Sequence, residues 1–198
     1  MNIVKFSNFL LEHKLWYKTI PQFLIWLEEK SNMMDFVFTD TETTGLGGPK
    51  KVQLTQVSAI STEYNLDKNN FIEKSSFNEK IKLTDETKKS KLKDSNINKV
   101  LKFNRYGSGE FKYKKEDTVL KMYFDWLGGQ RNPLLVIQNA EFDMNMINNR
   151  TDIRFNNEVF DTKQLIQLYF IPLIQKLAET DNNYKNMISG IGTSTRDG

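Results

Sequence analysis

The order of patterns along this chain predicts an α/β domain, with a mixed sheet flanked by helices. Strand patterns occupy residues 36–39, 52–61 and 71–83, and short polar or glycine-rich turns join them, which is typical of an antiparallel meander. A helical pattern over residues 117–127 follows, and then a wholly apolar run at residues 134–137. An apolar run without alternation indicates a strand buried on both faces, so we expect the later strands to be parallel.

The composition limits the kinds of chemistry that this chain can perform. Of its 198 residues, 38% are hydrophobic and 12% aromatic, which fits a globular protein with a substantial core. The absence of Cys excludes disulfides and thiolate metal sites and is compatible with a cytoplasmic location. The only His is His13, so a His-rich zinc site is excluded and a bound metal ion would need oxygen ligands.

Charge and hydropathy bear on the partners. The net charge of +3 permits a polyanionic partner without requiring one. No apolar run approaches the roughly 20 residues that span a bilayer, so we expect no membrane association.

The first 34 residues are predicted to form a helical extension ahead of a main domain over residues 35–198. Apolar residues recur there at near-helical spacing, and Pro21 suits the first turn of a second short helix. We favour a helical hairpin packed on the main domain. An amphipathic docking element for a partner is the alternative.

The most informative segment reads DTETTGL at residues 40–46, directly after the first predicted strand. Side chains two residues apart on a strand point to the same face, so Asp40 and Glu42 are predicted to project together at the edge of the sheet. Two carboxylates this close repel each other, and an oxygen-ligated Mg²⁺ or Mn²⁺ between them would remove the repulsion. A bare Asp-x-Glu is more often a pair of surface residues, so a second motif is needed.

A second motif, QNAEFD at residues 138–143, follows the apolar run. The strand is expected to deliver Asn139 to the sheet edge. The start of the next helix is then expected to turn Asp143 toward Asp40 and Glu42. The alternative is that Asp143 is a plain N-cap of a short helix, or that it fills both roles.

A long helix is predicted over residues 162–179. Asp161 precedes it and is expected to cap it rather than to bind a metal ion. Pro172 lies inside the helical pattern and is expected to kink or split the helix.

The segment of residues 84–116 is rich in lysine. Thr84 is a predicted N-cap, and we interpret the lysines that follow it as a solvated helix face, with contact to a phosphate backbone as the alternative. Farther on, residues 105–115 mix basic and aromatic side chains in a way that suits single-stranded nucleic acid, and ordinary loop chemistry explains them equally well.

Together the two motifs, each following a core strand, resemble those of the DEDD 3′–5′ exonucleases of the DEDDh type. The similarity is to the type found in the epsilon proofreading subunit of bacterial DNA polymerase III. It covers roughly residues 35–180 and implies a ribonuclease H-like fold. The activity it implies is metal-dependent removal of nucleotides from DNA 3′ ends, in proofreading or end processing. The same chemistry on RNA is the alternative.

The resemblance also implies roles for individual residues. Two Mg²⁺ or Mn²⁺ ions would be held by the acids of both motifs: Asp40, Glu42 and Asp143. Neighbouring residues would line the pocket for the terminal nucleotides: Thr43, Gly45, Leu46, Asn139 and Phe142. The implied partners are single-stranded DNA or a DNA 3′ end, RNA as the alternative, and a DNA polymerase.

One departure from the family pattern bears on activity. The last family motif, H-x-x-x-x-D, supplies a general base and a fourth carboxylate, and this sequence has no His after His13. We expect a chain truncated before that motif, with a degenerate enzyme as the alternative. The chain as it stands is therefore expected to have little or no exonuclease activity. A competing interpretation is a non-catalytic module that binds nucleic acid or a polymerase.

Overall fold

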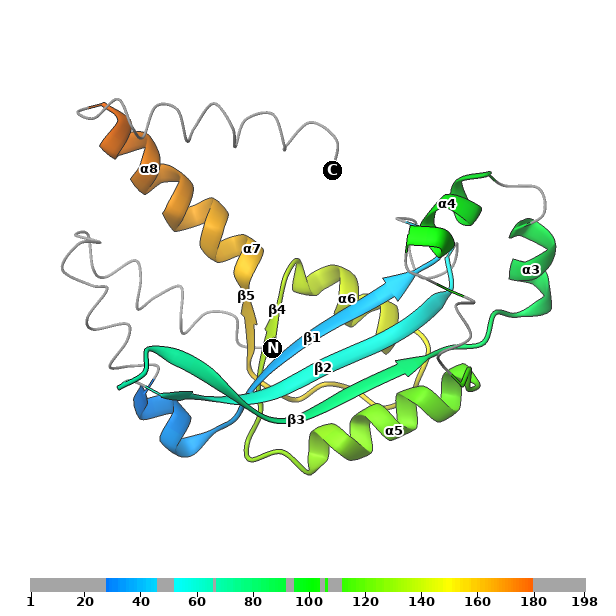
Figure 1. Cartoon of the computed structure of the whole chain (residues 1–198), viewed down its shortest axis with the longest axis horizontal. Helices are drawn as coiled ribbons and strands as arrows, with labels where there is room; N and C mark the ends of the chain where they lie inside the picture. Colours follow the sequence, from blue (N-terminus) through cyan, green and yellow to red (C-terminus); the bar gives the residue numbers. More distant parts are fainter. Residues whose placement is uncertain are drawn as a thin grey trace.

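The structure is a computed structural model, and it describes residues 28–45, 52–65, 67–91, 95–103, 106 and 112–179 (Figure 1). Most of the predicted N-terminal extension lies outside the described residues, as does Leu46. Within the extension, residues 28–33 are helical.

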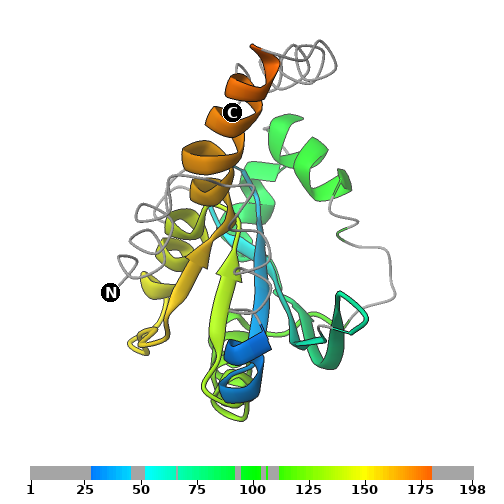
Figure 2. The ribbon, with the colours of Figure 1, turned by 90° about the vertical axis from the view of Figure 1, so that its left-hand side faces the viewer.

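A five-stranded mixed sheet forms the centre of the molecule, with the strand order β3-β2-β1-β4-β5 (Figures 1 and 2). The strands are β1 (Phe36–Thr43), β2 (Leu54–Asn65), β3 (Asn70–Lys80), β4 (Leu134–Ile137) and β5 (Val159–Asp161). Strand β2 pairs antiparallel with both β1 and β3, whereas β4 pairs parallel with both β1 and β5. This is an α/β fold with a mixed sheet flanked by helices, as the order of patterns predicts.

Strand boundaries differ from the predicted ones at the polar ends. Strand β2 runs on to Asn65, and β3 ends at Lys80 rather than at Leu83. The polar residues that follow the apolar part of β2 still belong to the strand, because they pair with β3.

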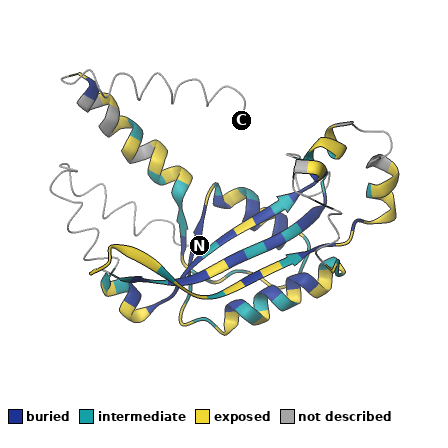
Figure 3. Cartoon of the chain, in the orientation of Figure 1, coloured by how far each residue is buried: buried dark blue, intermediate teal, exposed yellow. Residues whose placement is uncertain are grey.

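Two helices, α5 (Glu116–Gly128) and α6 (Ala140–Asn148), pack on the same face of the sheet. The main core lies between them and the strands, and α5 contributes Val119, Leu120, Tyr123 and Leu127 to it. Figure 3 shows the consequence as alternating buried and exposed residues along β1 and β2. Strand β4 is buried at all four positions, as its uninterrupted apolar sequence predicts.

The opposite face of the sheet carries a smaller apolar cluster. Met34, Phe36, Tyr64, Leu134 and Val136 are buried there, and Phe38 and Phe160 pack against them. This face becomes polar toward the carboxyl end of β1, where the candidate site lies.

The end of β1 projects beyond its parallel neighbour. The register pairs Phe36 with Leu134 and Phe38 with Val136, so the part of β1 after Phe38 has no β4 partner. Helix α6 begins just after β4 and packs beside this unpaired edge. The first motif therefore meets the second motif at one edge of the sheet.

The predicted long helix is divided into three parts. They are α7 (Thr162–Leu165), a π-helical turn η1 (Ile166–Phe170) and α8 (Ile171–Ala178). Pro172 lacks the N–H that an α-helix would direct to residue 168, and the π-helical turn directly precedes it. The helical segment is continuous from Thr162 to Ala178, so Pro172 does not split it, and a kink there stays a prediction.

The connection between β3 and α5 carries two short helices, α3 (Asp85–Lys91) and α4 (Ser95–Phe103). They lie near the carboxyl end of β1 in both views (Figures 1 and 2). Thr84 accepts a hydrogen bond from the backbone N–H of Thr87 at 3.1 Å, so its predicted N-cap role is confirmed. Among the described helices, none combines the length and the apolar character needed to cross a bilayer.

Candidate active site

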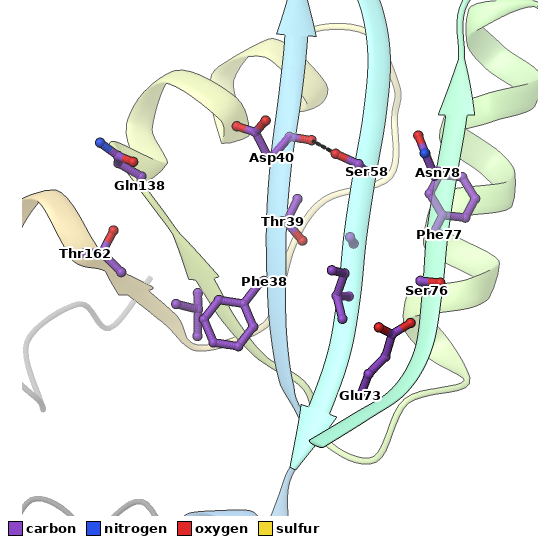
Figure 4. Close-up of a pocket in the computed structure, with 13 residues that line it drawn as sticks. Phe38, Thr39, Asp40, Ser58, Glu73, Ser76, Phe77, Asn78, Gln138 and Thr162 are labelled. Atoms are coloured by element: carbon purple, nitrogen blue, oxygen red, sulfur yellow. Dashed lines mark hydrogen bonds between the residues drawn. The ribbon is translucent and has the colours of Figure 1, made fainter. Parts of the chain in front are cut away.

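Asp40 lies on the open face of the sheet, on the part of β1 that extends past β4. The residue is exposed, and its main-chain carbonyl accepts a 3.4 Å hydrogen bond from the Ser58 hydroxyl (Figure 4). Protein packed around the carboxyl group raises the pKa of Asp40, and a hydrogen bond from the Thr41 backbone lowers it in part. Asp40 therefore combines access to solvent with an environment that disfavours its charge.

Asp143 is the most buried acid of the two motifs, with 4% of its surface exposed. It lies inside α6, one turn from the helix start, and its Oδ1 accepts two hydrogen bonds from Thr41. The backbone N–H donates at 2.9 Å and the hydroxyl at 2.6 Å. The N-cap of α6 is Asn139, so the alternative in which Asp143 caps this helix is wrong.

The environment of Asp143 raises its pKa to about 6. Burial is the largest cause, and the negative charge of Asp40 adds to it, whereas the two hydrogen bonds from Thr41 act in the opposite direction. Buried carboxyl groups with a raised pKa are often found at functional sites.

Thr41 joins the two acids. The backbone N–H of Thr41 lies beyond the end of β4 and donates to Asp143 rather than to a strand. The Thr41 backbone also lowers the pKa of Asp40. The two carboxyl groups thus approach the same short piece of β1 edge from different elements. The negative charge of Asp40 raises the pKa of Asp143, and the oxygen donors of both residues are those that a hard divalent cation prefers.

Glu42 is half-buried on β1 and lies opposite Gln56 of β2, just before an irregularity in the register at Thr43. Among the residues that the structure describes, no three Asp, Glu, His or Cys side chains form a ready-made metal site. The assignment of Asp40, Glu42 and Asp143 as a shared set of metal ligands therefore stays a prediction.

A groove of about 620 Å³ runs over the open face of the sheet beside Asp40. Figure 4 shows lining residues on β1, β2 and β3, with Gln138 and Thr162 on the other side of β1. Its apolar part is formed by Phe38, Ile60 and Val136, and its polar part includes Ser58, Asn78 and Gln138. A groove with an apolar floor and polar sides at an acidic strand end suits a nucleotide.

The predicted nucleotide-pocket residues after β1 form a tight turn. The Thr43 hydroxyl donates to the Gly45 carbonyl at 2.5 Å, and the side chain of Thr43 is buried. Among the described residues, a Cβ added to Gly45 would meet Val52 alone, at 3.6 Å, which is ordinary contact. Nothing in the described part of this turn therefore requires glycine. Leu46, the remaining predicted residue of this pocket, lies outside the described residues.

The predicted residues of the second motif are held from β5 and α7. Asn139 has a left-handed backbone with φ of 60°. Its side-chain oxygen accepts a 3.1 Å hydrogen bond from Lys163, while Phe142 packs partly against the main core. These contacts leave their predicted role in binding a nucleotide untested.

Asp161 has a larger role than the sequence indicates. It caps α7 by accepting from the Lys163 backbone N–H at 2.9 Å, which confirms the predicted cap. It also accepts from the backbone N–H groups of Asn139 and Ala140, at 3.0 Å each. One carboxylate therefore fixes the start of α6 and thereby the position of Asp143. Only the pairing of β5 beside β4 brings these groups together.

Gln53 is a second residue that the sequence patterns do not single out. It exchanges hydrogen bonds with Thr44, its N–H donating to the Thr44 hydroxyl at 3.0 Å and its carbonyl accepting from the Thr44 N–H at 3.0 Å. Its side chain donates to the Lys82 carbonyl and accepts from the Thr84 N–H, also at 3.0 Å each. Gln53 thus ties the end of the first motif to the start of α3.

No protein-family model matches the chain, and no curated protein matches it. Among solved structures, it is similar to the X-ray structure of the RNase domain of the yeast Pop2 protein, with a TM-score of 0.44 and 10% identity. The match covers 81% of this chain and 72% of that one. A superposition of this quality says nothing about chemistry, so we take the function from the residues of the site.

Proposed function

We propose that this chain is a metal-dependent nuclease of the DEDD type, acting on the 3′ ends of DNA. The observation that carries the proposal is the meeting of Asp40 and Asp143 around Thr41. Thr41 of the first motif and Asp143 of the second are hydrogen-bonded although they lie 102 residues apart, and the negative charge of Asp40 raises the pKa of Asp143. RNA is the alternative substrate, because the sequence has no feature that decides between the two sugars.

The residues of the site divide the work of binding and orientation. Asp40, Glu42 and Asp143 would hold the cations, which supply an activated water and stabilise the leaving 3′ oxygen when they are bound. Thr41 orients Asp143 through two hydrogen bonds, and Asp161 holds the helix on which Asp143 lies. The groove floor at Phe38 and Ile60 would take the terminal base.

The sequence offers this site no His nearby in the chain to act as a general base for proton transfer. A positioned general base is worth about 10²–10⁴ in rate, and the only His of this sequence is His13, in the predicted extension. We therefore expect the 198-residue chain to bind divalent metal and to hydrolyse nucleic acid slowly at most.

A non-catalytic role is the second candidate. The observation that favours it is that Oδ1 of Asp143 is already engaged twice by Thr41, which is also what a purely structural anchor of the β1 edge would show. In this case the chain would bind nucleic acid or a polymerase without cleaving.

The test combines metal binding with nucleotide release. Melting temperatures are measured with and without Mn²⁺ for the native chain, for Asp40→Asn, and for Asp67→Asn as a control in the exposed β2–β3 turn. The folded state gains about 2.7 kcal/mol at a metal concentration 100 times the Kd, so the native chain and the control should melt higher. Asp40→Asn should respond much less. An equal Mn²⁺ response in all three proteins would contradict the metal site.

Release of mononucleotides from 3′-labelled DNA and RNA then separates the two candidates. Slow, Mn²⁺-dependent release that Asp40→Asn abolishes supports the nuclease. Because the only His is His13, absence of release is expected of both candidates, and release that depends on Asp40 is the result that decides between them.

A further inference from the structure

Positive charge is concentrated in the connection between β3 and α5, residues 81–115. This stretch contains eleven Lys and Arg and four Asp and Glu. The rest of the chain contains seventeen Lys and Arg and twenty-one Asp and Glu, so it is net negative. The small net positive charge of the whole protein is therefore the sum of a strongly basic segment, residues 81–115, and an acidic remainder. Such segregation is the electrostatic footprint of a polyanion-binding surface.

This connection is firmly attached to the sheet. Ile81, Leu83 and Leu101 are buried. The hydroxyl of Tyr106 donates to the Ile81 carbonyl and accepts from the Leu83 N–H, both at 2.9 Å. Lys114 exchanges backbone hydrogen bonds with Lys80 and Lys82 at 3.0 and 2.8 Å. These hydrogen bonds fix the start and the end of the connection to the sheet.

The lysine side chains of this connection face solvent. The described ones that are exposed are Lys82, Lys88, Lys89, Lys99, Lys102, Lys112 and Lys115. Lys88 forms an exposed ion pair with Asp85 at 2.9 Å, and Lys114 pairs with Glu79. On α4, Lys99 and Lys102 are three residues apart and therefore share a helix face. We call these seven exposed residues the lysine surface.

The lysine surface begins beside the candidate active site. Gln53 bonds Thr44, which directly follows β1, and also bonds Lys82 and Thr84, where the connection starts. A groove of about 390 Å³ lies at this junction, with Lys82, Lys88 and Lys115 in its lining. Asp85, Glu116 and Asp117 line it as well, so the positive excess grows away from the junction, toward α4.

Aromatic rings accompany the lysines. Tyr106 and Tyr113 are both half-buried, and their ring centroids are 4.6 Å apart. Lysines with partly exposed aromatic rings are the combination that binds single strands, through phosphate contacts and base stacking.

We propose that the lysine surface binds the phosphate backbone of a single-stranded nucleic acid whose 3′ end lies at Asp40. This inference rests on the proposed function for its direction along the strand, but the binding itself needs neither metal nor cleavage. The occupant follows from charge complementarity, since the surface is basic, the remainder of the protein is acidic, and the site beside it is built for a nucleotide.

The test measures binding of labelled oligothymidine and oligouridine in EDTA across a range of salt concentrations. The variant is Lys99→Gln/Lys102→Gln. The control is Lys68→Gln/Lys121→Gln, which removes the same charge from exposed lysines outside the connection. Each lost phosphate contact flattens the dependence of log K on log salt by about 0.7 for single strands. The α4 variant should therefore lose about 1.4 in slope and bind roughly 25-fold more weakly at about 0.1 M salt.

The outcomes separate this inference from the proposed nuclease. Binding in EDTA needs neither metal nor cleavage, so a failed cleavage assay leaves the binding result intact. A flattened slope in the α4 variant alone supports the proposal, and the oligonucleotide that binds more tightly identifies the sugar. Equal weakening in the control and the α4 variant would overturn it. Competition by polyglutamate as strong as that by oligonucleotide would also overturn it and indicate an acidic protein partner. Melting temperatures of both double variants serve as the check on folding.

Discussion

Replacing Asp143 with Asn removes a buried charge and keeps the shape of the side chain. The amide oxygen can still accept the two hydrogen bonds from Thr41, and the amide has no charge for Asp40 to repel. Because burial and Asp40 are what raise the pKa of Asp143, we expect Asp143→Asn to stabilise the metal-free protein at neutral pH.

The size of the effect follows from proton linkage. The carboxyl group releases its proton near pH 3.8 when exposed and at about 6 in the folded protein. Between these values the folded state holds more protons than the unfolded state, so its stability falls as the pH rises from about 4 to about 6. At 1.36 kcal/mol for each unit of pKa, the full penalty is about 3 kcal/mol, and it applies above the folded pKa.

Urea unfolding of both proteins in EDTA, from pH 4 to pH 8, measures this difference. The stability of Asp143→Asn minus that of the native chain should increase by up to about 3 kcal/mol across the range. Asp143→Ala is the matched control. It leaves the Thr41 N–H and hydroxyl without their acceptor, which costs about 1–3 kcal/mol, and should be less stable than Asp143→Asn throughout.

Two results would refute the reasoning. A difference between Asp143→Asn and the native chain that does not change with pH would show that Asp143 has an ordinary pKa. A variant that is less stable than the native chain at pH 8 without metal would show that the charge is compensated. Saturating Mn²⁺ should reverse the order of stability, because only the native chain offers both carboxylates to the cation.

Three further changes test the supports of the site. Asp161→Ala removes the acceptor of three backbone N–H groups at the starts of α6 and α7, so it should lower stability by about 2–3 kcal/mol and weaken the Mn²⁺ response, both visible in thermal melts. Tyr123→Phe breaks the buried 3.0 Å hydrogen bond to the Thr39 hydroxyl and should cost about 1–2 kcal/mol in urea unfolding, and a neutral result would mean that the bond contributes nothing. Gly45→Ala should leave stability within about 0.5 kcal/mol, because the added Cβ has room, yet weaken oligonucleotide binding if a strand approaches this turn closely. Unfolding of Gly45→Ala at a much lower urea concentration would show that the fold, rather than a ligand, requires this glycine.

Local pattern was a sound guide to the elements of the sheet. The apolar β-branched residues before Asp40 and the uninterrupted run at residues 134–137 both form strands, and they pair in parallel as predicted. Thr84 and Asp161 cap the helices that they precede. Each of these features depends on residues that are only a few positions apart in the sequence, and over that range the spacing of residue types predicts local structure.

The sequence left the role of Asp143 open between the site and a helix N-cap, because the choice depends on distant partners. Asp143 was a reasonable N-cap by its position ahead of apolar residues, but the helix starts three residues earlier, at Ala140. The N–H groups at that start are taken by Asp161, which comes from the neighbouring strand. Asp143 is thereby left free of capping and turns to Thr41.

The sequence by itself determined the order of strands and helices, the placement of acids after two core strands, and the concentration of lysine in one connection. Only the tertiary structure decided that Asp143 is buried against Thr41, that Asp161 holds two helix starts, and that Gln53 joins the first motif to the lysine-rich connection. The physical reason is that backbone preferences act over a few residues. The cost of burying a charge, and the partner that satisfies a hydrogen bond, are set by whichever groups the folded sheet brings alongside.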